Sequence, residues 1–119
     1  MEENVINKPW GYYSDIERRK DLVFKKIVVF PGHKLSLQYH NKRSEIWYIE
    51  SGFAKVIIDD DILKMTDGSS VNIPLKVSHR VENLSQDFNL IIFEVQLGEC
   101  DENDIVRIED DYGREESPK

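Results

Sequence analysis

The sequence predicts an all-β protein, built as an antiparallel sandwich or a small barrel. Its middle consists of short runs rich in Val, Ile, Phe, Tyr and Leu, separated by Gly, Pro, Asn and Asp. No long stretch repeats its apolar residues at the helical period. The chain has 119 residues, and no linker-like segment or internal repeat divides it. We therefore expect a single domain over residues 1–119 whose core forms without disulfides.

Eight runs are expected to form strands. In chain order they cover residues 22–30, 34–40, 45–50, 54–58, 62–65, 70–73, 79–82 and 89–97. Turn-forming residues separate several of them, at Pro31-Gly32, Ser51-Gly52, Asp59-Asp60-Asp61 and Asp67-Gly68. Near the end of the chain, Ile105, Val106 and Ile108 indicate a last strand, preceded by a helical turn.

Alternation within the runs predicts which side chains share a face. The run 34–40 separates into a polar face and an expected core face, with Ser36, Gln38 and His40 on the first and Leu35, Leu37 and Tyr39 on the second. In the run 45–50, Glu45 shares its face with Trp47 and Ile49. A carboxylate on such an apolar face needs a partner, because burying it unpaired is costly.

The net charge of −7 is concentrated at the C-terminal end. Residues 99–119 hold nine of the 23 acidic residues and three of the 16 basic ones, so the rest of the chain is close to neutral. Nucleic acids and anionic membranes both require a basic surface, so neither is expected as a partner. A small anionic ligand needs only a few local cations. Two roles remain open for the acidic segment, a solvated tail and a cover over a site.

The sequence also bears on the compartment. Cys100 is the single cysteine, so no internal disulfide is possible. No basic stretch followed by an apolar run indicates a signal peptide, and no run approaches the roughly 18 apolar residues of a membrane span. We expect a cytoplasmic protein.

Four residues form a candidate metal site. Gln38, His40 and Glu45 lie close in sequence on two neighbouring runs, and His79 begins a later run. Two imidazoles, a carboxylate and an amide oxygen suit one divalent ion such as Zn, Mn, Fe, Co or Ni. Taken singly, each of these residues is also compatible with an ordinary strand or loop position.

The same residues resemble the two sequence motifs of the cupin superfamily. Nine positions match: Gly32, Gln38, His40, Glu45 and Gly52 in the first motif, and Gly68, Pro74, His79 and Asn83 in the second. Gln38 replaces the usual first His. Lys76 replaces a turn Gly, which implies a loop without positive φ there or a loop of different shape, and offers a cation near a phosphate.

This resemblance implies a cupin double-stranded β-helix, that is, a jelly-roll barrel with small flanking segments at both ends. The motif-bearing core would span residues 22–98 and the acidic C-terminal segment residues 99–119. A degenerate cupin that keeps the barrel and binds no metal is the alternative.

Further segments resemble the type II phosphomannose isomerase domain of this superfamily. They are residues 8–13, 31–40, 43–45, 79–83, 94–98 and 104–114, so the match covers most of the chain. In that family the domain commonly follows a mannose-1-phosphate guanylyltransferase domain, and this sequence has no Gly-rich nucleotide loop. The resemblance therefore implies the isomerase module standing alone. Ile46 stands where the family usually has a His, which implies one polar group fewer near the site.

The activity implied by the resemblance is interconversion of mannose 6-phosphate and fructose 6-phosphate through an enediolate, with the metal on Gln38, His40, Glu45 and His79. Glu94 is the first candidate for the base, because burial in the apolar run 89–97 would raise its pKa. Glu45 or a water molecule is the alternative base. An ion-pair or surface role is the alternative for Glu94.

A phosphorylated sugar also needs cations. The candidates are Lys34, Arg43, Arg80 and Arg114, all inside the matched segments, and Arg43 is a catalytic candidate beside Glu94. By analogy with other cupins we expect a homodimer, with the flank 5–13 able to swap onto a neighbour.

Two other functions stay open at this point. The first is a non-catalytic cupin that binds sugars or serves a nucleotide-sugar pathway, favoured by Ile46. The second is another metal-dependent cupin enzyme, such as a dioxygenase or an epimerase. Oxygen chemistry usually uses a redox-active metal on three His, so Gln38 argues against a dioxygenase.

Overall fold

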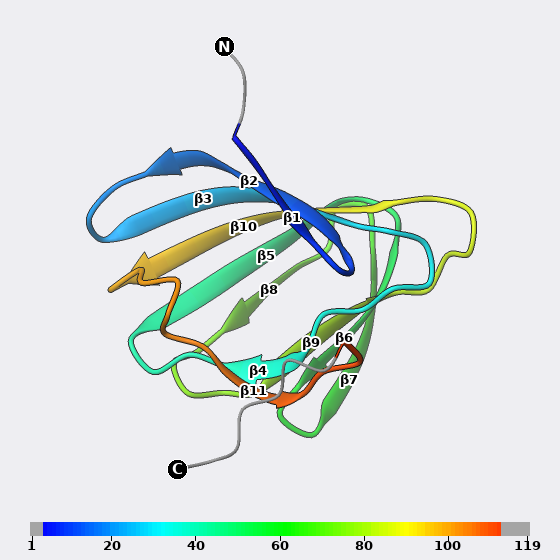
Figure 1. Cartoon of the computed structure of the whole chain (residues 1–119). Coiled ribbons are helices and arrows are strands. Elements are labelled where there is room, and N and C mark those ends of the chain that lie inside the picture. The colour runs from blue at the N-terminus through cyan, green and yellow to red at the C-terminus, as the bar shows by residue number, and fades with distance from the viewer. Residues whose placement is uncertain (1–3, 113–119) are drawn as a thin grey trace.

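The computed structural model describes residues 4–112, which form two antiparallel sheets that face each other (Figure 1). The first sheet has the order β1 (Val5–Lys8), β2 (Gly11–Arg18), β3 (Leu22–Val29), β10 (Leu90–Gly98), β5 (Arg43–Ser51) and β8 (Ser70–Ile73). The second has the order β11 (Val106–Glu109), β4 (Leu37–Tyr39), β9 (His79–Asn83), β6 (Phe53–Ile58) and β7 (Asp61–Thr66). These residues contain no helix, so none is long and apolar enough to cross a membrane.

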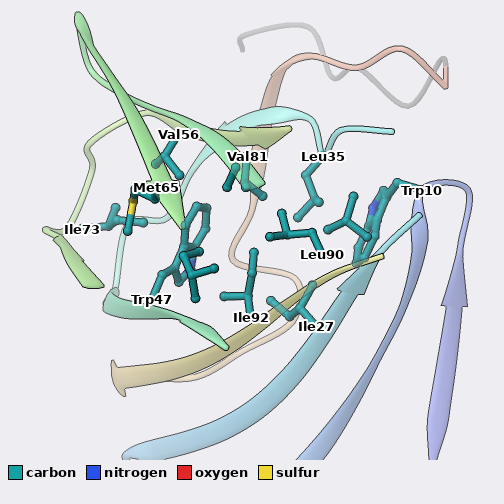
Figure 2. Packing of buried hydrophobic residues seen from close by; sticks show 13 residues of the cluster. Trp10, Ile27, Leu35, Trp47, Val56, Met65, Ile73, Val81, Leu90 and Ile92 are labelled. Atoms are coloured by element: carbon teal, nitrogen blue, oxygen red, sulfur yellow. The ribbon is translucent and has the colours of Figure 1, made fainter. Parts of the chain in front are cut away.

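The apolar core fills one end of the space between the sheets (Figure 2). Inward-facing Ile49, Leu90 and Ile92 are fully buried there, together with Val56 and Val81 from the opposite sheet. Burying a side chain of this size stabilises a fold by roughly 1.5–3 kcal/mol. These contacts hold the two sheets together.

The inner faces of the central strands change character along their length. In β10, the inner residues Leu90 and Ile92 are followed by Glu94 and Gln96, all of them buried. In β5, going the other way, the apolar inner residues give way to Glu45 and Arg43. Antiparallel pairing of β10 with β5 puts these polar ends beside each other. One end of the barrel is therefore a hydrophobic core, and the other is lined by buried polar groups.

Most of the predicted strands are confirmed, with differences at both ends. Strands β1 and β2 were not predicted, and they form a hairpin that extends the first sheet. At Gly11 an added Cβ would come 2.0 Å from the carbonyl oxygen of Val28, so only glycine allows this close pairing. The helical turn expected before the last strand is wrong, since residues 99–105 contain turns and irregular backbone only.

The assignment of faces in the run 34–40 is confirmed only in part, because Leu35 is buried in the core as expected and the other residues differ. Ser36 and His40 are buried toward the barrel interior, whereas Leu37 and Tyr39 are only half-buried. The polar end of the barrel interior explains this, because the inner face of β4 lines a polar space. The regular strand is also shorter than expected, and Lys34 forms only an isolated bridge to Glu82.

Lys76 takes the left-handed conformation, with φ of 64°. The loop was expected to avoid positive φ at this position or to take a different shape. Both expectations are wrong, because the loop keeps the positive φ that glycine would favour, with a lysine in that conformation. Its backbone N–H donates to the carbonyl of His40 at 2.7 Å, which ties the turn to the end of β4. The Lys76 side chain is exposed and does not line the cavity described below.

Candidate metal centre

A cavity of about 390 Å³ lies between the sheets at the polar end of the barrel. Trp10, Leu35 and Trp47 give it apolar walls, and charged side chains from both sheets line the rest. Cavities of this size hold small-molecule ligands. Residues from the C-terminal segment, among them Glu102 and Ile105, also line it. Part of the acidic segment therefore contributes to the cavity wall.

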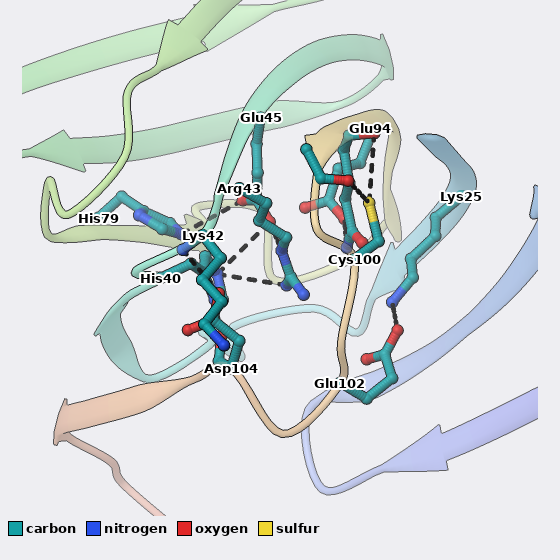
Figure 3. A network of polar contacts seen from close by, with 12 residues as sticks. Lys25, His40, Lys42, Arg43, Glu45, His79, Glu94, Cys100, Glu102 and Asp104 are labelled. Carbon is teal, nitrogen blue, oxygen red and sulfur yellow. Dashed lines mark hydrogen bonds and ion pairs between the residues drawn. The ribbon is translucent and has the colours of Figure 1, made fainter. Parts of the chain in front are cut away.

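Three buried side chains bring metal-ligand atoms together in this cavity. His40, Glu45 and His79 each offer one atom, and these atoms all lie within 4.8 Å of one another. Glu45 Oε2 is 3.4 Å from His40 Nε2, and Glu45 Oε1 is 3.3 Å from His79 Nε2. Figure 3 shows both imidazole rings directed toward the carboxylate, which comes from the opposite sheet.

Backbone carbonyls orient the two imidazoles. Nδ1 of His40 lies 2.6 Å from the carbonyl oxygen of Asp104, and Nδ1 of His79 lies 3.0 Å from that of Val77. A carbonyl only accepts, so each Nδ1 carries the hydrogen, and a neutral ring then presents a lone pair at Nε2. Metal-binding histidines are held in the same way.

Glu45 is charged although it is buried. Burial alone would raise the pKa of its carboxyl. Its interaction with His79, with the charges of His40 and Arg43, holds that pKa well below its usual range. Arg43 Nε donates to Oε2 at 3.1 Å. For His79, burial lowers the pKa, and its interaction with Glu45 outweighs this and raises it.

The residues present fit a divalent metal ion. Glu45 Oε1 is buried and accepts no hydrogen bond from the described residues, although it faces an imidazole nitrogen. A buried carboxylate beside two Nε2 atoms requires a proton on an imidazole or a cation among them. Two imidazoles and a carboxylate are a suitable donor set for the ions considered above.

Gln38 lies next to this group. It pairs with His79 across β4 and β9, and it lines the same cavity. Its amide nitrogen donates to the hydroxyl of Ser36 at 3.1 Å, so the amide oxygen is the atom that it can offer to a cation.

Glu94 is a second buried carboxyl in the cavity. Trp47 Nε1 donates to one of its oxygens at 2.8 Å, and Gln96 Nε2 donates to the other at 2.7 Å. Burial, with the nearby negative charge of Glu45, raises the pKa of Glu94 to about 7. The carboxyl thus changes protonation state near neutral pH, as expected of an acid–base group.

Of the three predicted phosphate cations within residues 4–112, one lines the cavity. Arg43 lines it, with a side chain that is 6% exposed. Lys34 and Arg80 do not line it, and both pair with Asp111, at 3.3 and 3.2 Å. Arg114 lies outside the described residues.

Ile46 lies on the outer surface of β5, where it is 37% exposed. Alternation along the strand turns it away from Glu45. The expectation that this position removes a polar group from the site is therefore wrong.

Several cavity residues were not predicted as site residues from the sequence, among them three charged ones. Lys25 is buried on the inner face of β3, Arg107 lies in β11, and Glu102 comes from the segment between β10 and β11. A signal existed for Lys25, because it alternates with apolar Val23 and Ile27 in the run 22–30. No comparable signal exists for Arg107, whose position depends on the pairing of β11 with β4.

Solved structures identify the fold. An RmlC-like cupin from Shewanella frigidimarina is similar with a TM-score of 0.74 and 19% identity, over 85% of this chain and 87% of that one. Oxalate decarboxylase from Bacillus subtilis is similar with a TM-score of 0.78 and 20% identity, over 89% of this chain and 30% of that one. At such identities the similarity shows the fold alone, and the protein has the predicted cupin fold.

Sequence comparison shows the family. The family model described as "Mannose-6-phosphate isomerase C-terminal" matches residues 2–110, and the chain belongs to this family. The resemblance found in the sequence is thereby confirmed.

Named relatives are much longer proteins. The xanthan biosynthesis protein XanB of Xanthomonas campestris pv. campestris (strain B100) is 44% identical over 92% of this chain and 23% of its own length. A mannose-1-phosphate guanylyltransferase of Escherichia coli (strain K12) is 40% identical over the same shares. The alginate biosynthesis protein AlgA of Pseudomonas aeruginosa is 40% identical over 95% of this chain and 24% of its own. The chain thus spans about a quarter of these relatives.

Proposed function

We propose that this domain is a metal-dependent sugar-phosphate isomerase that interconverts mannose 6-phosphate and fructose 6-phosphate. The observation that carries the proposal is one cavity with two different carboxyl groups. Glu45 is held ionised beside two imidazoles, and Glu94 has a pKa near 7. The family description, mannose-6-phosphate isomerase, agrees with this chemistry.

The reaction moves one hydrogen between two neighbouring carbons of the open-chain sugar. A base removes the proton from C2 of the aldose, and the electron pair moves to the C1 carbonyl to give an enediolate. The carbon-bound proton then returns to C1, and the hydroxyl proton of the C2 oxygen passes to the C1 oxygen, so that C2 carries the new carbonyl and C1 the new hydroxyl. No oxidant or reductant is consumed.

Glu94 is suited to carry this proton. As a carboxylate it accepts the proton from C2, and as a carboxylic acid it delivers it to C1. A pKa near 7 lets both forms exist at neutral pH. The hydrogen bonds from Trp47 and Gln96 fix its position in the cavity wall.

Gln38, His40, Glu45 and His79 would hold the metal ion. When bound, the ion supplies an electrophile that polarises the sugar carbonyl. Arg43 adds a second positive charge at the same place, because its guanidinium lies 3.1 Å from Glu45 Oε2 and 3.4 Å from His40 Nε2. The apolar walls formed by Trp10 and Trp47 exclude water and strengthen these interactions.

A coupled assay of fructose 6-phosphate formation from mannose 6-phosphate tests the proposal. Metal-stripped protein is compared with protein reloaded with Mn, Co, Zn or Ni. We expect turnover only after reloading, loss of turnover in His79→Ala, and full turnover in His33→Ala. His33 is the matched control, because it stacks on Tyr112 and does not line the cavity.

Glu94→Gln tests the base. We expect it to keep the metal and to lose roughly 10²- to 10⁴-fold in turnover. Metal binding without turnover by any ion would replace the isomerase with a non-catalytic sugar-binding cupin. Oxygen uptake by the iron-loaded protein on addition of substrate would instead indicate an oxygenase.

A further inference from the structure

A second charged cluster lies in the cavity, away from the metal-ligand group. Lys25 Nζ is 2.9 Å from Glu102 Oε1, and its side chain is only 5% exposed. Figure 3 shows Lys25 and Glu102 on one side of the polar network and His40 and His79 on the other, with Arg43 and Glu94 between them. A ligand that reaches both groups must be extended and carry different chemistry at its two ends.

Lys25 places a buried ammonium group in the cavity wall, where it can bind an anion. Burial of a lysine is costly unless a negative charge compensates it. Its Nζ lies over the Tyr13 ring, 4.1 Å from the centroid, which favours the cation without neutralising it. The compensating anion is Glu102. The same oxygen, Glu102 Oε1, also pairs with the Arg18 guanidinium at 2.8 Å.

Glu102 is the more exposed member of this pair, and side-chain contacts rather than strand pairing hold it in place. It lies in a turn between β10 and β11, and its side chain is 46% exposed. Burial raises the pKa of its carboxyl, and the charge of Lys25 and the hydrogen bonds from Lys25 and Arg18 outweigh this and lower it. Glu102 is therefore an anion at the edge of the cavity, and rotation of its exposed side chain would release Lys25.

Strand pairing brings a second cation to the cavity from the opposite sheet. Lys25 pairs with Glu94 across β3 and β10. Arg107 pairs with Gln38 across β11 and β4 and lines the same cavity. Arg107 therefore lies on the metal-ligand side of the cavity and Lys25 beside Glu94, so Lys25 is the cation of the second cluster.

We propose that Lys25 binds the phosphate of the substrate, and that Glu102 occupies Lys25 in the free protein until the phosphate displaces it. This deepens the proposed isomerase function and rests on it for the identity of the sugar phosphate. A phosphate carries more negative charge than a carboxylate and has three acceptor oxygens, so it replaces Glu102 favourably. In a sugar 6-phosphate, the phosphate and the reacting carbons are at opposite ends of the chain, and Lys25 lies on the opposite side of the polar network from His40 and His79 (Figure 3).

The experiment uses mannitol 6-phosphate, which has no carbonyl and cannot be isomerised, and mannitol as the uncharged counterpart. Isothermal titration calorimetry on metal-loaded protein gives the dissociation constant of each. We expect wild type to bind the phosphorylated compound more tightly, and Lys25→Gln to weaken that binding about 10- to 100-fold without affecting mannitol. Lys25→Arg should keep most of the affinity.

Lys26→Gln is the matched control, since Lys26 is the next residue of β3 and faces the other side of the sheet. Equal effects of Lys25→Gln and Lys26→Gln would overturn the subsite, as would a wild type that does not distinguish mannitol 6-phosphate from mannitol.

Glu102→Gln gives a result of opposite sign and does not depend on the folding of the Lys25 variants. Removing the competing carboxylate should tighten mannitol 6-phosphate binding several-fold. Unchanged or weaker binding would overturn the displacement by phosphate, because a purely structural Lys25–Glu102 pair predicts no gain.

The two proposals fail separately. Lys25-dependent binding without turnover by any metal-loaded protein would remove the isomerase and leave the phosphate subsite. Turnover with an unchanged KM for mannose 6-phosphate in Lys25→Gln would remove the subsite and leave the isomerase.

Discussion

Glu94 and Glu45 show how position decides the behaviour of two buried carboxyl groups in one cavity. Glu45 faces two imidazoles and a guanidinium, which favour its ionised form. Glu94 accepts hydrogen bonds from two neutral groups, an indole and an amide, and burial dominates its pKa. The first is therefore suited to bind a cation and the second to exchange a proton.

Glu94 should make the metal-stripped protein less stable as the pH rises. The folded state holds the proton more tightly than the unfolded state, because the pKa rises from 4.5 to about 7 on folding. Its contribution is fully favourable below pH 4.5 and is lost as the pH approaches 7, a difference of about 3 kcal/mol. Glu94→Gln cannot ionise and should not show this loss.

Urea unfolding of wild type and Glu94→Gln at pH values from 4.5 to 8 measures the difference. The variant should gain on wild type across this range. Parallel curves for the two proteins would show that the carboxyl of Glu94 does not have a raised pKa.

Lys76 illustrates a local conformation that residue type alone does not reveal. A lysine with φ of 64° is strained relative to glycine. The Lys76 side chain is exposed, so burial of that side chain does not offset the strain. Lys76→Gly should raise the free energy of unfolding by about 0.5–1 kcal/mol, after the entropy that glycine gains in the unfolded chain is subtracted. Thermal or urea unfolding measures it.

Lys64→Gly is the contrasting control. Lys64 is also exposed, but it lies within β7, where glycine weakens a strand. Loss of stability in both variants would contradict a strained conformation at Lys76.

At the scale of elements, the C-terminal segment completes the cavity. The backbone carbonyl of Asp104 orients His40, and the Asp104 carboxylate accepts from the backbone N–H groups of Asn41 and Lys42, each at 2.9 Å. β11 then pairs with β4. The segment therefore holds the turn that carries one imidazole ligand.

Asp104→Ala should cost about 1–2 kcal/mol in stability, because two backbone donors lose their partner. It should also weaken metal binding, since the turn that carries His40 loosens. Glu99→Ala is the control, because Glu99 is exposed and makes only a 3.8 Å ion pair with Lys42. Unfolding curves and a metal titration measure both effects, and an Asp104→Ala protein equal to the control would argue against this role.

The predictability of these elements differs for physical reasons. Runs such as 45–50 and 89–97 were found because they are short stretches of β-branched, aromatic and other apolar residues, and the structure confirms them as strands. The hairpin of β1 and β2 was missed because charged residues such as Asp15, Glu17 and Arg18 hide its alternation. In the run 34–40, the face of Ser36, Gln38 and His40 was predicted only as polar, because alternation cannot distinguish a polar cavity from solvent.

At the scale of the whole molecule, the barrel joins residues that are distant in sequence. Gln38, His40, Glu45 and His79 were predicted together because the cupin motifs preserve their spacing, and the structure places them around one cavity. Lys25, Glu102 and Arg107 reach that cavity only through strand pairing and the path of the C-terminal segment. Pairing of this kind is not encoded in local sequence spacing.

The most direct test of the central claim, that this cavity is a metal centre, is the stoichiometry and affinity of metal binding. Metal-stripped protein is titrated with Mn, Co, Zn or Ni, and bound metal is counted by mass spectrometry. The account predicts one ion per chain, at least 10- to 100-fold weaker binding in His79→Ala and His40→Ala, and unchanged binding in His33→Ala. Binding that was absent from wild type, or equal in all three variants, would contradict it.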